Sequence, residues 1–144
     1  MPKTLGRPSM ISRDQMFEPL LVALPSFQCH WDEFLSEWLG EDVLPLYLAL
    51  SSLARHLVDL LAQGCDEQLR AAFRVVEQWH VEGDAYVKEA ATVGLLEDLQ
   101  NSNLHEGTDP EQFRRYLGPE SQRWWNKVVR FWSEGRLLTD DPDG

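Results

Sequence analysis

The sequence predicts an all-α fold, an irregular bundle of about six to seven helices. In several segments apolar residues recur at helical spacing, and Gly, Pro and capping residues separate these segments. The sequence lacks alternating runs of β-branched residues, and no Asn-Gly or Asp-Gly pair lies between apolar segments, so strands are not expected. With 144 residues the chain has the length of one domain. We expect a helical domain over residues 13–138, a flexible segment over 1–12 and an acidic flexible tail over 139–144.

Three helices are predicted in the N-terminal part of the chain. The first spans residues 13–24, and Pro19 within it shortens or kinks it because proline lacks a backbone N–H. The second begins at Ser26, a favourable N-cap, and ends at Gly40, which supplies a left-handed stop. The third covers residues 45–64 and carries one continuous leucine stripe, so we expect it to be the most buried helix.

Four further helices are predicted, and the first three of them have Asp66, Asp84 and Asp109 as N-caps. The predicted ranges are 66–82, 84–99, 109–117 and 119–135. Neighbouring helices in the middle of the chain resemble the stacked hairpins of HEAT repeats, although the sequence has no repeat of fixed period.

Two of these helices have a predicted packing role. In the helix over 84–99, small residues such as Gly94 leave a shallow surface that allows another helix to approach closely. In the last helix, Trp124, Val128 and Phe131 are expected to lock it onto the bundle. The last helix should therefore belong to the core rather than extend from it.

The chain is strongly acidic, with 24 Asp and Glu, 13 Lys and Arg, and a formal net charge of −11. Such a charge repels phosphate backbones and anionic membranes, so direct binding of nucleic acid or membrane is not expected. The acidity is segregated, because residues 114–136 carry a net charge of +4 and the rest of the chain carries −15. This pattern favours encounter with a basic protein, and the alternative is a purely solubilising role.

The number and spacing of cysteines and the hydropathy of the chain indicate the cellular compartment. The two cysteines, Cys29 and Cys65, have no CxxC spacing, so the sequence encodes neither a disulfide framework nor a thiolate zinc site. The apolar run at residues 20–24 is too short and too late for a secretory signal, and no stretch approaches the ~18 apolar residues of a membrane span. We expect a cytoplasmic protein without a cofactor.

One pair of residues has the spacing of metal ligands. Glu77 and His80 stand at i and i+3 on a predicted helix, as in half of a di-iron carboxylate site. His56 and Asp59 have the same spacing in a different order, and Glu37 or Glu97 could be added to complete a set of ligands. A hydrogen-bonded His80 at a helix edge is the structural alternative. We predict no metal site, because half-sets of ligands arise by chance in a chain so rich in carboxylates.

The sequence also lacks the motifs of nucleophilic and phosphate chemistry. Neither GxSxG, a P-loop nor GxGxxG occurs. Cys29 and His30 are adjacent, but neighbours on a helix point about 100° apart and cannot share a proton there. Glu97 lies among leucines, so we expect partial burial, a raised pKa and a structural partner. We therefore predict that the protein is not an enzyme.

The predicted function rests on a segment where acids and aromatics alternate. Residues 32–42 contain five acids and no base, and two of the six Trp of the chain flank or interrupt this run. Charge accelerates encounter with a partner, and buried aromatic side chains slow its release. We expect an acidic row at i, i+4 and i+8, two Trp anchors at i and i+7, and help from the loop over 103–109. The predicted partner-binding residues are Trp31, Glu33, Glu37, Trp38, Glu41, Asp42, His105, Glu106 and Asp109.

Two segments resemble an uncharacterised family of small helical bacterial proteins. They are FRVVEQWHVEGDAYVKEAATVGLLEDLQN at residues 73–101 and FRRYLGPESQRWW at residues 113–125, about a third of the chain. The VE pair, the GD turn, the AATVGLLE helix and the LGPES-W connection carry the resemblance. Such proteins are similar to immunity proteins of bacterial polymorphic-toxin systems, which protect the producing cell by blocking a toxin domain. The resemblance implies a protein partner and supplies no catalytic residue.

These observations lead to one leading hypothesis and two alternatives. The leading hypothesis is a cytoplasmic immunity protein that occludes a cognate basic toxin, such as a nuclease, a deaminase or an ADP-ribosyltransferase. The first alternative is a helical adaptor or regulatory module that uses the same surface. The second is a small metal-dependent helical enzyme, which metal analysis of the native protein would test.

Overall fold

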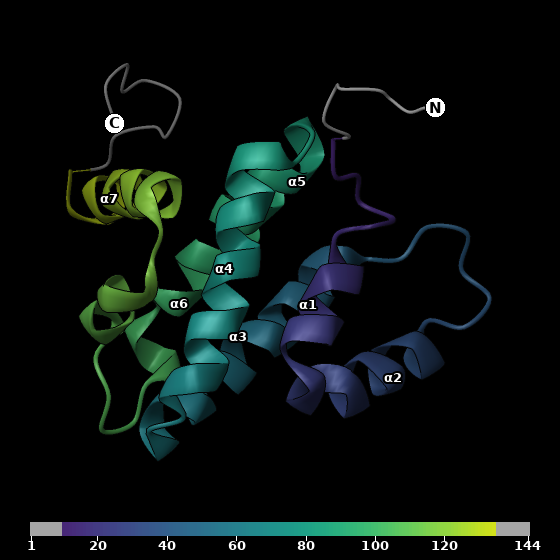
Figure 1. The fold of residues 1–144 in the computed structure, drawn as a ribbon, viewed down its shortest axis with the longest axis horizontal. Coiled ribbons are helices and arrows are strands. Elements are labelled where there is room, and N and C mark those ends of the chain that lie inside the picture. The colour runs from purple at the N-terminus through teal and green to yellow at the C-terminus, as the bar shows by residue number, and fades with distance from the viewer. Residues whose placement is uncertain (1–9, 135–144) are drawn as a thin grey trace.

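Helices make up the regular structure of residues 10–134, which are the residues described by the computed structural model (Figure 1). The α-helices are α1 (Phe17–Ala23), α2 (Gln28–Glu37), α3 (Leu46–Gln63), α4 (Asp66–Glu82), α5 (Ala85–Glu89), α6 (Glu97–Leu99) and α7 (Pro119–Glu134). The π-helix Ala90–Leu96 joins α5 to α6, and the 3₁₀ helices η1 (Pro25–Phe27), η3 (Ser102–Leu104) and η4 (Pro110–Tyr116) lie in the connections. Between residues 10 and 134 there is no strand, so the all-α prediction is confirmed.

The long helices α3 and α4 form the centre of the bundle. Leu50, Leu53 and Leu57 of the predicted leucine stripe are fully buried, because apolar residues spaced by three and four positions lie on one side of a helix. Gly64 ends α3 with a φ of 73°, in the left-handed region that glycine adopts without strain. The connection to α4 is so short that the two helices form an antiparallel hairpin.

Two predicted N-caps are wrong. Ser26 lies inside η1, where its hydroxyl donates to Gln68 Oε1 at 2.6 Å and lies 2.8 Å from His56 Nε2 instead of capping α2. Asp66 is the first residue of α4, and its carboxylate accepts hydrogen bonds from Arg70 and from the Tyr116 hydroxyl. In both cases the side chain forms a hydrogen bond with a residue distant in sequence, Gln68 for Ser26 and Tyr116 for Asp66.

Other helix boundaries agree with the local sequence. Asp84 caps α5 by accepting from the backbone N–H of Val87 at 2.9 Å. Asp109 forms a capping box with Gln112, although the segment that follows is the 3₁₀ helix η4 rather than an α-helix. α1 begins at residue 17, later than predicted, so Pro19 falls in its first turn, where its missing N–H costs no hydrogen bond.

The described part of the N-terminal segment pairs with the α4–α5 junction. The backbone N–H of Ile11 donates to Glu82, and the N–H of Asp84 donates to Ile11, each at 2.9 Å. The fully buried indole of Trp79 donates to the Met16 carbonyl at 2.9 Å, which places α1 on α4. Residues 1–9 of the predicted flexible segment and the whole predicted tail lie outside the described residues.

The predicted helix over 84–99 is interrupted by a π-helical segment that packs closely on α3. A Cβ atom added to Gly94 would lie 2.9 Å from Leu50 Cδ1 and 3.3 Å from the Tyr47 ring. This close approach confirms the shallow surface predicted from the small residues of the segment. The π geometry itself was not predicted, because the sequence periods of the two helix types are too similar over seven residues.

α7 packs on α4 and on the π-helix through Ser121, Trp125 and Val128, all fully buried. Val128 is buried as predicted and Trp124 does pack against the core, but the fully buried ring is that of its neighbour Trp125. Trp124 is only partly buried and has the ammonium of Lys127 4.3 Å from its ring centroid. Phe131 is also partly buried, so the inward side of α7 is turned from the predicted one towards Trp125 and Ser121, with Val128 common to both.

Truncation of the two neighbouring tryptophans should have unequal effects. Trp125→Ala should lower the free energy of unfolding by about 3–5 kcal/mol, because a fully buried ring leaves a cavity. Trp124→Ala should cost clearly less, since part of that ring already contacts solvent. Urea denaturation of both variants measures the difference, and equal losses would contradict the register of α7 described above.

The predicted metal pair Glu77 and His80 connects α4 to α7 instead. Glu77 accepts from the backbone N–H groups of Glu120 and Ser121 at 3.0 and 2.9 Å, so it caps the first turn of α7. The two ring nitrogens of His80 lie 2.9 Å from Ser121 Oγ and 3.0 Å from Thr92 Oγ1. His80 is therefore hydrogen-bonded, as in the structural alternative to a metal site, although the residue is buried rather than at a helix edge.

This network makes stability depend on pH. Burial lowers the pKa of His80 to about 4, against the opposing field of the Glu77 and Glu120 carboxylates. Burial alone would raise the pKa of Glu77, but hydrogen bonds from Glu120 and Ser121 bring it below its ordinary value. His80 is thus neutral in the folded state at pH values where the unfolded chain already binds a proton on it.

Between pH 6.5 and about 4, His80 should reduce the free energy of unfolding progressively, by about 3 kcal/mol in total. The contribution is fully present above the unfolded pKa and is lost as the pH falls towards the folded pKa. Denaturation of the wild type and of His80→Gln across this range isolates the effect, because the other histidines are present in both proteins. The same pH dependence in both proteins would refute it.

Candidate protein-binding surface

α2 lies at the edge of the bundle and is lightly attached to it (Figure 1). Its single fully buried residue is Phe34, and it packs on α3 and η1. Trp31 contributes a partly buried ring that stacks on Phe17 of α1, with the ring centroids 4.5 Å apart. The remaining face of α2 is therefore directed towards solvent.

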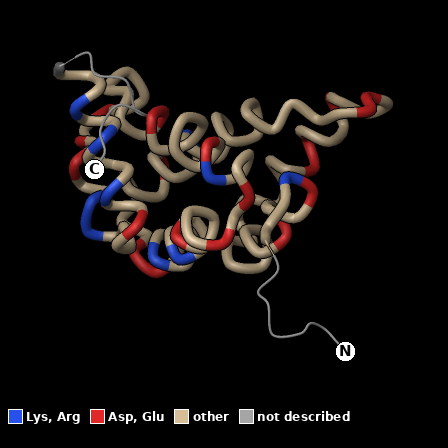
Figure 2. The backbone as a smooth tube through the Cα atoms, turned by 90° about the horizontal axis from the view of Figure 1, so that it is seen from above, with Lys and Arg blue, Asp and Glu red and all other residues tan. Residues whose placement is uncertain are grey.

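The segment that contains α1, α2 and the α2–α3 loop has one sign of charge. Residues 14–54 contain seven Asp and Glu and neither Lys nor Arg. Figure 2 shows the α2–α3 loop as an acidic tip at one end of the molecule, whereas Lys and Arg are concentrated towards the other end, near α7. The charge segregation expected from the sequence is thus a separation in space.

Local pairing explains why the basic end does not neutralise the acidic one. Three ion pairs join bases to acids close in sequence, namely Arg70–Asp66, Arg114–Glu111 and Arg123–Glu120, at 2.7–3.1 Å. None of these three involves an acid of α1, α2 or the α2–α3 loop. The acids of the N-terminal part therefore keep an excess of negative charge, with Arg13 and Arg55 as the bases that line the hollows beside them.

Exposed apolar side chains accompany the acids on this side. Leu39 is 86% exposed and Val43 66% exposed, both in the α2–α3 loop, and Leu48 at the start of α3 is 51% exposed. Leucine and valine contacts of this kind release water when a partner covers them. We call the exposed residues Glu33, Glu37, Leu39, Glu41, Asp42 and Val43 the acidic α2 surface.

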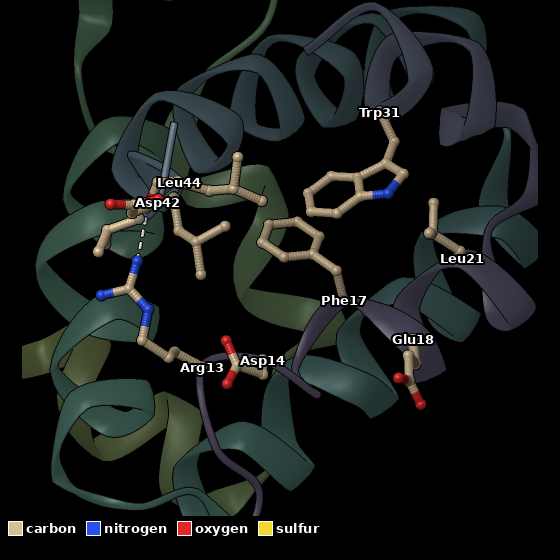
Figure 3. Close-up of a pocket in the computed structure, with 10 residues that line it drawn as sticks. Arg13, Asp14, Phe17, Glu18, Leu21, Trp31, Asp42 and Leu44 are labelled. Carbon is tan, nitrogen blue, oxygen red and sulfur yellow. Dashed lines mark hydrogen bonds between the residues drawn. The ribbon is translucent and has the colours of Figure 1, made fainter. Parts of the chain in front are cut away.

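Two hollows flank α2. The larger, about 660 Å³, lies between α1, α2 and the α2–α3 loop and includes Trp31 and Asp42 (Figure 3). The smaller, about 330 Å³, lies between α2 and α3 and is lined by Glu33, Glu37 and Trp38 on α2 and its C-terminal cap, with Arg55 on α3. Six of the nine predicted partner-binding residues belong to this region, and five of these line one of the two hollows.

The sixth, Glu41, does not belong to the predicted helical row. α2 ends at residue 37, Trp38 is its C-cap, and Gly40 turns the chain with a φ of 95°. Glu33 and Glu37 therefore remain on one helical face, while Glu41 is exposed in the loop. Trp31 and Trp38 are both partly buried against the core, so they support the surface more than they project from it.

The loop predicted to help α2 lies on the opposite side of the bundle (Figure 1). His105 there donates from Nε2 to the Leu99 carbonyl at 2.9 Å, and its Nδ1 is 2.8 Å from Thr108 Oγ1. Asp109 is the N-cap of η4, and Glu106 is exposed. The structure therefore does not bring His105, Glu106 and Asp109 together with α2, and the expected joint surface is wrong in its geometry.

The other residues considered for chemistry have structural environments. Among the described residues, no three His, Cys, Asp or Glu side chains come together in a group that could hold a metal ion. Burial and the neighbouring Asp98 raise the pKa of Glu97, in the expected direction. His56 stands near His30, with ring centroids 5.1 Å apart, and burial followed by repulsion from His30 lowers its pKa. This histidine pair was not predicted, since only the packing of α2 on α3 creates it.

The fold and this surface define a small all-α domain with one acidic, partly apolar face. The chain belongs to the family described as Domain of unknown function (DUF7674), whose model matches residues 17–133 and thus spans nearly all of the described helices. Neither a curated protein nor a solved structure matches the chain. Between residues 10 and 134, no helix has the length and apolar character needed to cross a membrane.

Proposed function

We propose that this protein is a cytoplasmic immunity protein, which binds a basic bacterial toxin domain through the acidic α2 surface and blocks its substrate-binding face. The observation that carries the proposal is the charge of residues 14–54, with seven acids and no Lys or Arg, displayed beside the exposed Leu39 and Val43. A toxin that binds nucleic acid or a nucleotide phosphate needs a positive face, and this surface is complementary to such a face. The resemblance of residues 73–101 and 113–125 to immunity-like proteins supports the same conclusion.

Two physical terms would act together in such a complex. The carboxylates of Glu33, Glu37 and Glu41 raise the association rate by steering a positive partner. Leu39 and Val43 lose water on contact and lower the dissociation rate. This function requires no catalytic group, because blocking a substrate-binding face depends on shape complementarity and charge alone.

A helical adaptor would use the same surface and differs only in its partner. A large toxin gene directly upstream of the gene for this protein would favour the immunity function over the adaptor. The metal-dependent enzyme is not proposed, because Glu77 and His80 are both engaged in holding α7.

Reversal of Glu33, Glu37 and Glu41 to Lys should abolish protection of cells that express the toxin domain of the neighbouring gene. The fold should persist, because each residue is exposed and such substitutions usually change stability by no more than about 0.5 kcal/mol. The matched control reverses three exposed acids elsewhere, Glu67, Glu82 and Glu89, with the same change in net charge.

Survival assays and titration calorimetry of the purified pair measure the effect. We expect binding to weaken by several kcal/mol in the first triple variant and by much less in the control, since steering depends on where the charge lies. If the variant with Glu33, Glu37 and Glu41 reversed folds and still protects normally, the proposed surface is wrong. Equal losses in both triple variants would show that net charge alone matters.

A further inference from the structure

We infer that the larger hollow beside α2 receives an arginine side chain of the partner, an inference that rests on the proposed function and names its anchor. We call this hollow the Trp31 cavity; it lies between α1, α2 and the α2–α3 loop. Its volume of about 660 Å³ falls in the range of roughly 300–1,000 Å³ typical of ligand pockets, more than one side chain needs. The remaining room suits the backbone of the loop that would carry the arginine.

The base of the cavity is aromatic and apolar. Phe17 and Trp31 stack with 4.5 Å between their centroids and an angle of 23° between their planes, and Figure 3 shows the two rings at the middle of the cavity. Leu21 and Leu44 complete the apolar lining. Neither aromatic ring is free to rotate away, because Phe17 also contacts the fully buried Trp79 and Trp31 also contacts Phe34. Phe17 is buried, so the partly exposed Trp31 is the ring available to a ligand, and its position is fixed in advance.

Three carboxylates from separate segments surround this base. Asp14 precedes α1, Glu18 lies in its first turn, and Asp42 comes from the α2–α3 loop, and all three line the cavity and are exposed. Within residues 10–134 their carboxylates have neither a hydrogen-bond partner nor an ion-pair partner. Three acids from separate segments that outnumber the single base of the described lining favour a cation in the cavity.

Among residues 10–134, Arg13 is the one basic residue that lines the cavity, and its side chain is bound to the cavity wall. Arg13 donates from Nη2 to the Leu44 carbonyl at 2.6 Å, as the dashed line in Figure 3 marks, and its guanidinium lies 4.5 Å from the centroid of the Tyr86 ring. Arg13 thereby fastens the α2–α3 loop to the start of α1. Three acids against one base leave the lining with a net charge of −2.

Arginine fits these features better than other cationic side chains. A planar guanidinium stacks on an aromatic face and at the same time presents paired N–H donors to carboxylates around its edge. Arg13 itself shows this mode of binding in the wall of the cavity, with a ring against its face and a carbonyl at its edge. An anionic group would meet three carboxylates and is disfavoured.

The test uses the full chain and the blocked peptide acetyl-Gly-Arg-Gly-amide, with the isosteric citrulline peptide as the neutral probe. We expect the arginine peptide to shift the indole N–H resonance of Trp31 in a saturable, salt-sensitive manner. The citrulline peptide should bind at least about tenfold more weakly, because it keeps the shape and loses the charge. The lysine peptide should fall between the two.

Matched variants locate the site. Asp14→Asn with Asp42→Asn should weaken binding of the arginine peptide by about tenfold or more, whereas Glu67→Gln with Glu82→Gln, at exposed acids outside the cavity and outside the acidic α2 surface, should leave it nearly unchanged. Equal binding of the arginine and citrulline peptides overturns the inference, as does a shift confined to residues outside the cavity.

The outcomes separate this inference from the proposed function. If reversal of Glu33, Glu37 and Glu41 abolishes protection but the arginine peptide does not bind, the acidic α2 surface remains supported and the cavity is not its anchor. If the arginine peptide binds specifically but the reversed variant still protects fully, the arginine site remains supported and the proposed docking surface is wrong.

Discussion

A half-buried carboxylate of α4, placed at the start of α7, holds the C-terminal half of this bundle together. The first N–H groups of a helix have no partner within the helix, and their aligned dipoles favour a negative charge nearby. Glu77 reaches across from α4 to accept two of these N–H groups, and three residues later His80 bonds to Ser121 of the same turn. Gly118 is required beside this contact, because a Cβ there would lie 2.5 Å from Glu77 Cδ. A metal-like spacing in sequence thus arises from a cap supplied by another helix.

The arrangement that follows separates a tightly held half of the molecule from a lightly held one. α7 places Trp125 and Val128 in the core and also buries Lys127, whereas the exposed Arg123 pairs with Glu120 of the same helix. α2, by contrast, fully buries only Phe34. Because the bases are neutralised locally at one end, the acids of residues 14–42 remain a coherent negative field at the other.

The elements that local sequence alone determines were predicted, and those that depend on distant contacts were not. The leucine stripe of α3, the stop at Gly64 and the cap at Asp84 were predicted, since each involves residues within a few positions of one another. The cap at Ser26 was wrong because Ser26 lies inside η1 and its hydroxyl donates to Gln68, 42 positions away, while Phe27 takes the N-cap position of α2. Among the candidate site residues, the clustering of acids near α2 could be read from sequence, but the early end of α2 and the remote position of His105 could not, because both follow from tertiary packing.

The light attachment of α2 to the core makes this helix a suitable place for recognition. A residue at the outer face of α2 can change with little effect on the core, because exposed substitutions usually alter stability by no more than about 0.5 kcal/mol. The stacked Phe17 and Trp31 and the Arg13 link to Leu44 nevertheless hold the helix and the loop in one position. A surface whose frame is fixed and whose outer residues can vary allows specificity to change without loss of the fold. A protein that must follow a changing basic partner requires this combination, and the α7 end, bound by buried polar contacts, lacks it.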